Sequence, residues 1–216
     1  MTVGPRPGAA AIRLSPLIGA AVGGAGGLLY WGAAEVWPSS IAVALAMLTM
    51  AALDPPRGIA PSSPLRIAES PGGVAPGRRP WLAVLTVLLE YNALMALSAA
   101  KLPYALPPNV SLGILMAAGH AVARALALSV TPGQSQPQVH GPSTADLAIA
   151  LVIGFLPAAL IGVPGLVGVA AAIAARMAFV AFLRRSPGSA DGAVGVVMKA
   201  AEIGFYLGTL AAWSFI

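Results

Sequence analysis

Long apolar runs recur along this chain and decide what it can fold into. Crossing the roughly 30 Å of hydrocarbon in a bilayer takes about 17–25 helical residues. The runs that reach or approach this length are 14–30, 39–53, 81–100, 110–130, 147–163, 165–183 and 193–215. They show no sustained alternation of apolar and polar residues, which favours helices over a membrane barrel. The sequence therefore predicts an all-α, polytopic transmembrane helical bundle of about seven spans, with residues 1–216 in a single integral-membrane domain.

The composition narrows the classes of protein further. The chain is 58% hydrophobic and 9% charged, whereas soluble domains are about 45–50% apolar and about 25% charged. It contains no cysteine, which excludes disulfides, thiolate metal sites and iron–sulfur clusters. Its two histidines argue against a multi-histidine metal or haem site. Because charged residues are scarce, the position of each one is informative.

Basic residues are distributed unevenly between the predicted loops. If the spans alternate across the membrane, eight Lys and Arg residues fall on the N-terminal side and only Lys101 falls opposite. Such residues in short loops favour the cytoplasm. We therefore predict a multi-pass protein of the bacterial inner (plasma) membrane with a cytoplasmic N-terminus, a retained first span and cytoplasmic loops at about 54–80, 131–146 and 184–192. This topology and the attraction of anionic lipid headgroups explain the net charge of +5 without a nucleic-acid partner.

Several ionisable residues lie inside the predicted spans, where they are costly and usually face a partner. Glu90 lies midway along the third span, and His120 and Arg124 share one face of the fourth at i, i+4 spacing. A Glu90–Arg124 pair is the simplest way to neutralise both charges. Lys199 and Glu202 lie at i, i+3 in the last span, a spacing at which they could pair with each other. Structural and functional roles are both open for these residues.

Three local patterns predict details of the fold. Glycines four residues apart, such as Gly23 and Gly27, allow helix backbones to approach closely in lipid. Asp146 follows Ser143 just before the fifth span, which is typical of a helix N-terminus. The fifth and sixth spans are separated only by Pro164. That pair is either a tight hairpin or one irregular re-entrant unit.

Several stretches together resemble one known family. Residues 15–23, SPLIGAAVG, are similar to the small-residue helix with which that family's chains open. Arg124 falls near the family's Ser-Arg pair in a later helix. Residues 184–195, RRSPGSADGAVG, look like its R-x-x-G-G-x-T-G-D-x-x-G motif, with the Gly-Asp inverted, and Glu202 follows seven residues after the last Gly, where the family has Glu. The family is that of the cobalamin synthases, the adenosylcobinamide-GDP ribazoletransferases.

The resemblance extends to the acidic loop that follows the family's second helix. The family motif H-x-D-G-x-A-D-x-x-D-G corresponds to residues 52–58, ALDPPRG, which keep Asp54, and its M-R-D corresponds to Ile-Ala-Glu ending at Glu69. The resemblance implies that adenosylcobinamide-GDP is joined to α-ribazole or its 5′-phosphate with release of GMP and with Mg²⁺ as cofactor. The implied catalytic acids are Asp54, Glu69 and Asp191, of which Asp54 and Glu69 hold the metal. Arg124 is implied to bind phosphate.

The same resemblance places Lys199 and Glu202 in the outer part of the substrate-binding region. The implied partners are the corrinoid nucleotide, the ribazole substrate and the lipid bilayer. A homo-oligomer and contacts with other membrane proteins of the cobalamin pathway stay open.

Two other functions are consistent with the residues. One is a catalytically silent relative that binds corrinoid or scaffolds a membrane partner, because only Asp54 of the acidic motif in residues 52–58 remains and Pro55-Pro56 replace the motif's Gly and the residue after it. The other is a small transporter, in which Glu90, His120 and Arg124 would form a polar path at mid-membrane.

Overall fold

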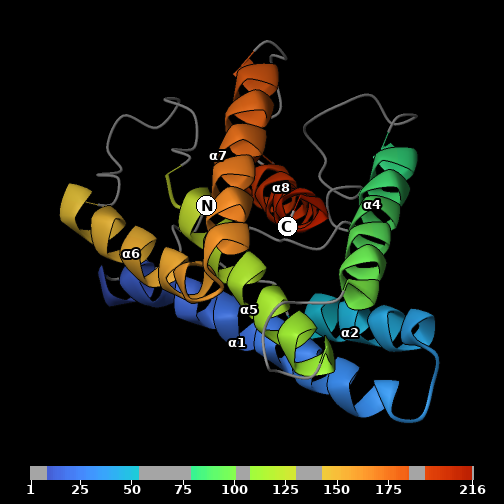
Figure 1. Cartoon of the computed structure of the whole chain (residues 1–216). Coiled ribbons are helices and arrows are strands. Elements are labelled where there is room, and N and C mark those ends of the chain that lie inside the picture. The colour runs from blue at the N-terminus through green and yellow to red at the C-terminus, as the bar shows by residue number, and fades with distance from the viewer. Residues whose placement is uncertain (1–8, 54–78, 101–107, 130–142, 185–192, 216) are drawn as a thin grey trace.

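The apolar runs form helices because a helix satisfies its backbone hydrogen bonds within one segment. The computed structural model describes residues 9–53, 79–100, 108–129, 143–184 and 193–215. Within these ranges the chain forms seven α-helices and no strand, which confirms the predicted all-α bundle (Figure 1). The helices are α1 (Ala9–Ala34), α2 (Ser39–Leu53), α4 (Arg79–Ala99), α5 (Pro108–Ala127), α6 (Thr144–Leu160), α7 (Val163–Arg184) and α8 (Ala193–Ser214).

Four of these helices contain segments long and apolar enough to cross a membrane. The remaining apolar segments, in α2, α4 and α6, are shorter, at 10–17 residues. Large apolar side chains are exposed on the outside of the bundle, among them Leu28 and Phe182, as expected for a surface that meets lipid. The four longer segments are Ala10–Ala34, Val110–Ala127, Val163–Phe182 and Gly195–Ser214.

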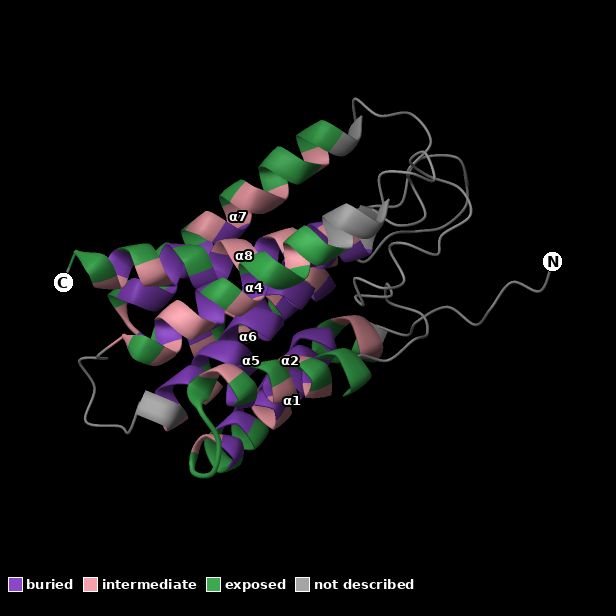
Figure 2. Cartoon of the chain, turned by 90° about the vertical axis from the view of Figure 1, so that its right-hand side faces the viewer, coloured by how far each residue is buried: buried purple, intermediate pink, exposed green. Residues whose placement is uncertain are grey.

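Helix α5 lies at the centre of the bundle and packs against α1, α4, α6, α7 and α8. In the most apolar segment of α5, 78% of the residues are buried, whereas in the corresponding segment of α7 only 17% are buried. Figure 2 shows the same contrast, with α5 mostly buried and the outer part of α7 exposed. Polar residues on α5 are therefore placed in the interior of the protein.

The contact between α1 and α5 is made through glycine. Gly27 of α1 lies against Gly113 of α5, and Gly23 lies against the backbone of Met116. A Cβ added to Gly23 would come 2.2 Å from the Met116 carbonyl oxygen, so no side chain fits there. The prediction that these glycines allow close helix packing is confirmed.

Gly27→Ala is expected to destabilise the bundle. The added Cβ would lie 2.4 Å from the Gly113 Cα atom, and because that atom is backbone, the two helices must move apart. We expect the free energy of unfolding in mixed micelles to fall by about 1–3 kcal/mol. Gly24→Ala is the matched control, because nothing lies within 4 Å of its added Cβ. An equal loss in both variants would contradict this account of the α1–α5 contact.

Helices α6 and α7 are joined by a tight turn at Gly162. Gly162 follows the C-cap residue Ile161 and has φ 80°, a conformation that favours glycine. Pro164 lies in the first turn of α7, where a missing N–H removes no helical hydrogen bond. The two helices diverge from this turn in Figure 1. Of the two alternatives for this region, the structure has two separate helices joined by a tight turn.

Candidate functional site

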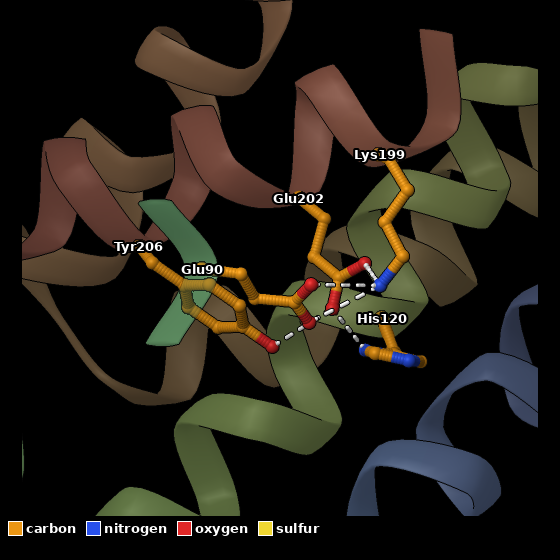
Figure 3. A network of polar contacts seen from close by, with 5 residues as sticks. All are labelled: Glu90, His120, Lys199, Glu202 and Tyr206. Carbon is orange, nitrogen blue, oxygen red and sulfur yellow. Dashed lines mark hydrogen bonds and ion pairs between the residues drawn. The ribbon is translucent and has the colours of Figure 1, made fainter. Parts of the chain in front are cut away.

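Three helices bring five polar side chains together inside the bundle (Figure 3). They are Glu90 of α4, His120 of α5, and Lys199, Glu202 and Tyr206 of α8. All five are buried, and Glu202 and Tyr206 have no exposed surface. We call these five residues the buried charge cluster.

Lys199 links the two carboxylates of the cluster. Its Nζ donates to Glu90 Oε1 at 3.1 Å and to Oε2 at 3.2 Å. It also lies 2.8 Å from Glu202 Oε2, which is the pairing that the i, i+3 spacing of Lys199 and Glu202 allows. The ammonium therefore supplies the positive charge that lies between Glu90 and Glu202 (Figure 3).

Glu202 receives two further partners at its other oxygen. His120 Nδ1 lies 2.7 Å from Glu202 Oε1, and the Tyr206 hydroxyl donates to the same oxygen at 3.2 Å. Gly119, the residue before His120, makes room for the tyrosine, because an added Cβ would come 2.6 Å from the Tyr206 Cε1 atom. Both oxygens of Glu202 thus have side chains of α5 or α8 within 3.2 Å.

Spacing along α8 explains why three members of the cluster come from one helix. Lys199, Glu202 and Tyr206 lie at i, i+3 and i+7, which places them on the same face. The opposite side of α8 is lined by Gly204 and Gly208, which pack against α7. One face of α8 is therefore polar toward α4 and α5, and the other packs closely on its neighbour.

The predicted pair between Glu90 and Arg124 is wrong, because Glu90 binds Lys199 instead. Arg124 lies one turn from His120, toward the end of α5, and both side chains are buried, as their i, i+4 spacing predicts. The stem of Arg124 passes over Gly19 of α1, where an added Cβ would come 2.7 Å from the Arg124 Cδ atom. The pairing differs because α8 packs beside α4 and presents an ammonium directly to Glu90.

The start of α6 carries the predicted cap and an additional ion pair. Ser143 is the N-cap residue and accepts a hydrogen bond from the Asp146 backbone N–H at 3.1 Å. The Ser143 hydroxyl also donates to Asp146 Oδ2 at 2.7 Å, and Arg13 of α1 donates to Oδ1. Asp146 precedes the predicted span. The pKa of its carboxyl is lowered, most by the hydrogen bond from Ser143 and next by the hydrogen bond from Arg13. The Arg13 contact fixes the start of α1 beside the start of α6.

Arg176 of α7 has a role that the sequence did not predict. Its guanidinium donates to the carbonyl oxygens of Leu126 and Ser129, at 3.3 Å and 3.2 Å. These carbonyls lie at the end of α5, where the last turn of a helix leaves acceptors without an intrahelical partner. Arg176 therefore caps α5 from a neighbouring helix.

Three of the predicted site residues, Asp54, Glu69 and Asp191, lie outside the described residues. In the part of the chain that the structure describes, no group of three or more His, Cys, Asp or Glu side chains is arranged to hold a metal ion. Arg124, Lys199 and Glu202 are described and buried, and they lie on α5 and α8, two helices that pack together.

The described chain is thus an all-α helical bundle with ionisable side chains buried between α4, α5 and α8. No family model, curated protein or solved structure matches the sequence or the structure.

Proposed function

We propose that the protein is an adenosylcobinamide-GDP ribazoletransferase of the cobalamin synthase type. It would join adenosylcobinamide-GDP to α-ribazole or its 5′-phosphate and release GMP. One observation carries the proposal. The two family-like stretches around Arg124 and Glu202, far apart in sequence, lie on helices that pack together, and the 2.7 Å contact from His120 to Glu202 links them.

The proposed roles follow the positions that resemble the family. Asp54 and Glu69 would hold Mg²⁺, which neutralises charge on a diphosphate and on its leaving group when bound. Asp191 would be the third catalytic acid. Arg124 would bind a substrate phosphate, since a guanidinium matches phosphate oxygens in two-point contacts. Lys199 and Glu202 would support Arg124 from within the bundle.

A direct assay tests the proposed activity. Purified protein in lipid vesicles with Mg²⁺ is expected to convert adenosylcobinamide-GDP and α-ribazole to the joined corrinoid, with one GMP released for each product molecule. If neither the joined corrinoid nor GMP is formed, the proposal that the protein is an enzyme is wrong. Binding of adenosylcobinamide-GDP without turnover, unchanged by Asp54→Ala, would instead identify a catalytically silent relative.

The proposed location is the bacterial inner membrane, with the N-terminus in the cytoplasm. The contact between Arg13 and Asp146 places the starts of α1 and α6 together, and both starts adjoin predicted cytoplasmic segments. The end of α5, near Arg124, lies toward the same side, because α1 and α5 are antiparallel. The charged residues at these helix ends therefore support one common aqueous side.

Cysteine labelling is expected to show this topology. The chain has no cysteine of its own, so single substitutions report one position each. Glu35→Cys lies in the exposed turn after α1 and should react with a membrane-impermeant maleimide in intact spheroplasts. Ser62→Cys, in the predicted loop 54–80, should react only after lysis. The reverse pattern would place the N-terminus outside the cytoplasm.

A further inference from the structure

Helix α7 carries one charge inside a candidate membrane span. Its segment Val163–Phe182 is the most apolar of the four long segments, and Arg176 is the only charged residue in it. The Arg176 side chain is partly buried and donates to the carbonyl oxygens of Leu126 and Ser129 at the end of α5. A charge within a span is costly and usually faces a partner. The groups around the guanidinium therefore decide whether its charge is compensated within the protein.

No carboxylate among the described residues compensates this charge. Two of the described carboxylates bind Lys199 in the buried charge cluster, and a third, Asp146, binds Arg13. The fourth, Glu35, lies in the exposed turn after α1, and the end of α1 is opposite the end of α5 because these helices are antiparallel. Arg124 of α5 is a further cation, and its stem lies against α1. The charge on α7 is thus left without a described counter-ion.

The end of α5 offsets only part of the charge. A helix C-terminus is equivalent to about half a negative elementary charge. The Leu126 oxygen also has other donors, since it accepts from the Ser129 backbone N–H at 3.3 Å and from the Ser129 hydroxyl at 2.6 Å. Arg176 uses its Nε and Nη2 atoms for the bonds to α5. Because a guanidinium has five N–H donors, both N–H groups of Nη1 and the second of Nη2 are left for an acidic acceptor.

An apolar strip runs along α7 beside Arg176. It consists of residues at i, i+4, i+7 and i+11, which share one side of the helix. Two of them are 55% and 61% exposed, the third is exposed and the fourth is partly buried. Helix α8 packs against a different side of α7, at Gly168, and the outer part of α7 is open in Figure 2. We call this set the α7 strip: Leu166, Ala170, Ile173 and Met177.

The α7 strip has about the length of one lipid acyl chain. It leads from the level of Arg176 toward the turn at Gly162, over a rise of about 16 Å at 1.5 Å per residue. An acyl chain in one leaflet covers about half of the roughly 30 Å hydrocarbon core. The guanidinium reaches Ser129, which directly precedes the predicted cytoplasmic segment 131–146. Anionic lipids are concentrated on the cytoplasmic side of a membrane.

We propose that Arg176 and the α7 strip form a binding site for one anionic phospholipid. The lipid phosphate accepts from Nη1 and Nη2 of Arg176, and one acyl chain lies along the strip. A zwitterionic lipid brings its own cation and leaves the Arg176 charge uncompensated, so the site favours a headgroup with a net negative charge. The site requires neither the transferase substrates nor Mg²⁺, and its test is therefore separate from that of the proposed function.

Native mass spectrometry of the purified protein in detergent tests the site. Phosphatidylglycerol and phosphatidylcholine with identical acyl chains are titrated separately. We expect one phosphatidylglycerol per protein chain to bind at least about fivefold more tightly than phosphatidylcholine, which is the change in affinity that one basic residue near an anionic lipid typically contributes. An excess of soluble glycerol phosphate, which has the phosphate but no acyl chain, should not displace the lipid.

Arg176→Gln should abolish the preference for phosphatidylglycerol. Glutamine keeps a donor that can reach the α5 carbonyls but carries no charge. Arg13→Gln is the matched control, because it also removes one guanidinium from a helix end on the same predicted side. Since Arg13 is paired with Asp146, this variant should keep the preference.

A second variant tests the site without changing Arg176. Phe179→Glu places a carboxylate at i+3 from Arg176, on a side chain that is exposed, where it competes with the lipid phosphate. We expect it to lower the affinity for phosphatidylglycerol by about the same factor as Arg176→Gln. Ala178→Glu adds the same charge at i+2, on another side of α7, and should have a smaller effect.

Three results would overturn the proposal. One is equal affinity of the unsubstituted protein for the two lipids. Another is a preference for phosphatidylglycerol that survives Arg176→Gln in protein with a native elution profile and helix content. The third is displacement of the lipid by glycerol phosphate, which would show a phosphate site that does not use the α7 strip. If Arg176→Gln does not fold, the comparison of Phe179→Glu with Ala178→Glu decides, and equal affinities in these two variants contradict the site.

Discussion

Lys199→Met is expected to lower the free energy of unfolding by about 3–5 kcal/mol, the range typical when one partner of a buried ion pair is removed. The substitution keeps the length of the side chain but deletes the ammonium that binds Glu90 and Glu202. Two buried carboxylates then lie close together without their common counter-charge. Reversible unfolding by SDS in mixed micelles measures the loss.

A double substitution separates this electrostatic effect from lost packing. In Glu90→Gln combined with Lys199→Met, one carboxylate is neutralised, and Glu202 keeps its contact with His120. We therefore expect the double variant to be more stable than Lys199→Met alone. If the double variant is no more stable than Lys199→Met alone, Lys199 stabilises the bundle through the packing of its stem and not through its charge.

Asp54→Asn is expected to lower the proposed transferase activity by at least about 100-fold. Substituting a residue that only hydrogen-bonds to a metal ligand typically lowers metal affinity or activity by about 10–100-fold. Asp54 is proposed to bind Mg²⁺ directly, so its substitution should cost at least as much. Asparagine keeps the shape but removes the negative charge. The measurement is the rate of corrinoid product formed from adenosylcobinamide-GDP and α-ribazole.

Glu35→Gln is the control for this substitution. It removes one carboxylate in the same conservative way, but from the exposed turn that follows α1. Its activity should equal that of the unsubstituted protein. If Asp54→Asn keeps full activity while the unsubstituted protein is active, the acidic loop does not hold the metal, and the role proposed for Asp54 is wrong.

The helices could be predicted from the sequence because each one corresponds to a single long run of mostly apolar residues. The predicted run 39–53 has the same bounds as α2, and the predicted run 193–215 ends one residue after α8. The cap formed by Ser143 and Asp146 was also predictable, since its atoms lie within one helical turn. Such features depend only on residues close together in the chain.

The partner of Glu90 could not be predicted in the same way. Every helix here is apolar around most of its circumference, so periodicity does not show which helix faces which. Glu90 meets Lys199, which lies 109 residues further along the chain, because α4 and α8 pack side by side. The spacing of Lys199, Glu202 and Tyr206 on one face was visible in the sequence, but an isolated tyrosine in an apolar helix indicates a core residue rather than a hydrogen-bond donor.

The origin of the cluster in three separate helices has a consequence for how the protein is made. A membrane protein is synthesised from its N-terminus, so Glu90 and His120 are produced well before α8. Lys199 and Glu202, their partners in the folded bundle, belong to α8, the last helix of the described residues. Until α8 is inserted, Glu90 has to remain beside the aqueous channel of the insertion machinery or be protonated in lipid. Helix α8 thus completes the electrostatics of two helices that precede it, and a chain that stops before α8 would leave Glu90 without its counter-charge.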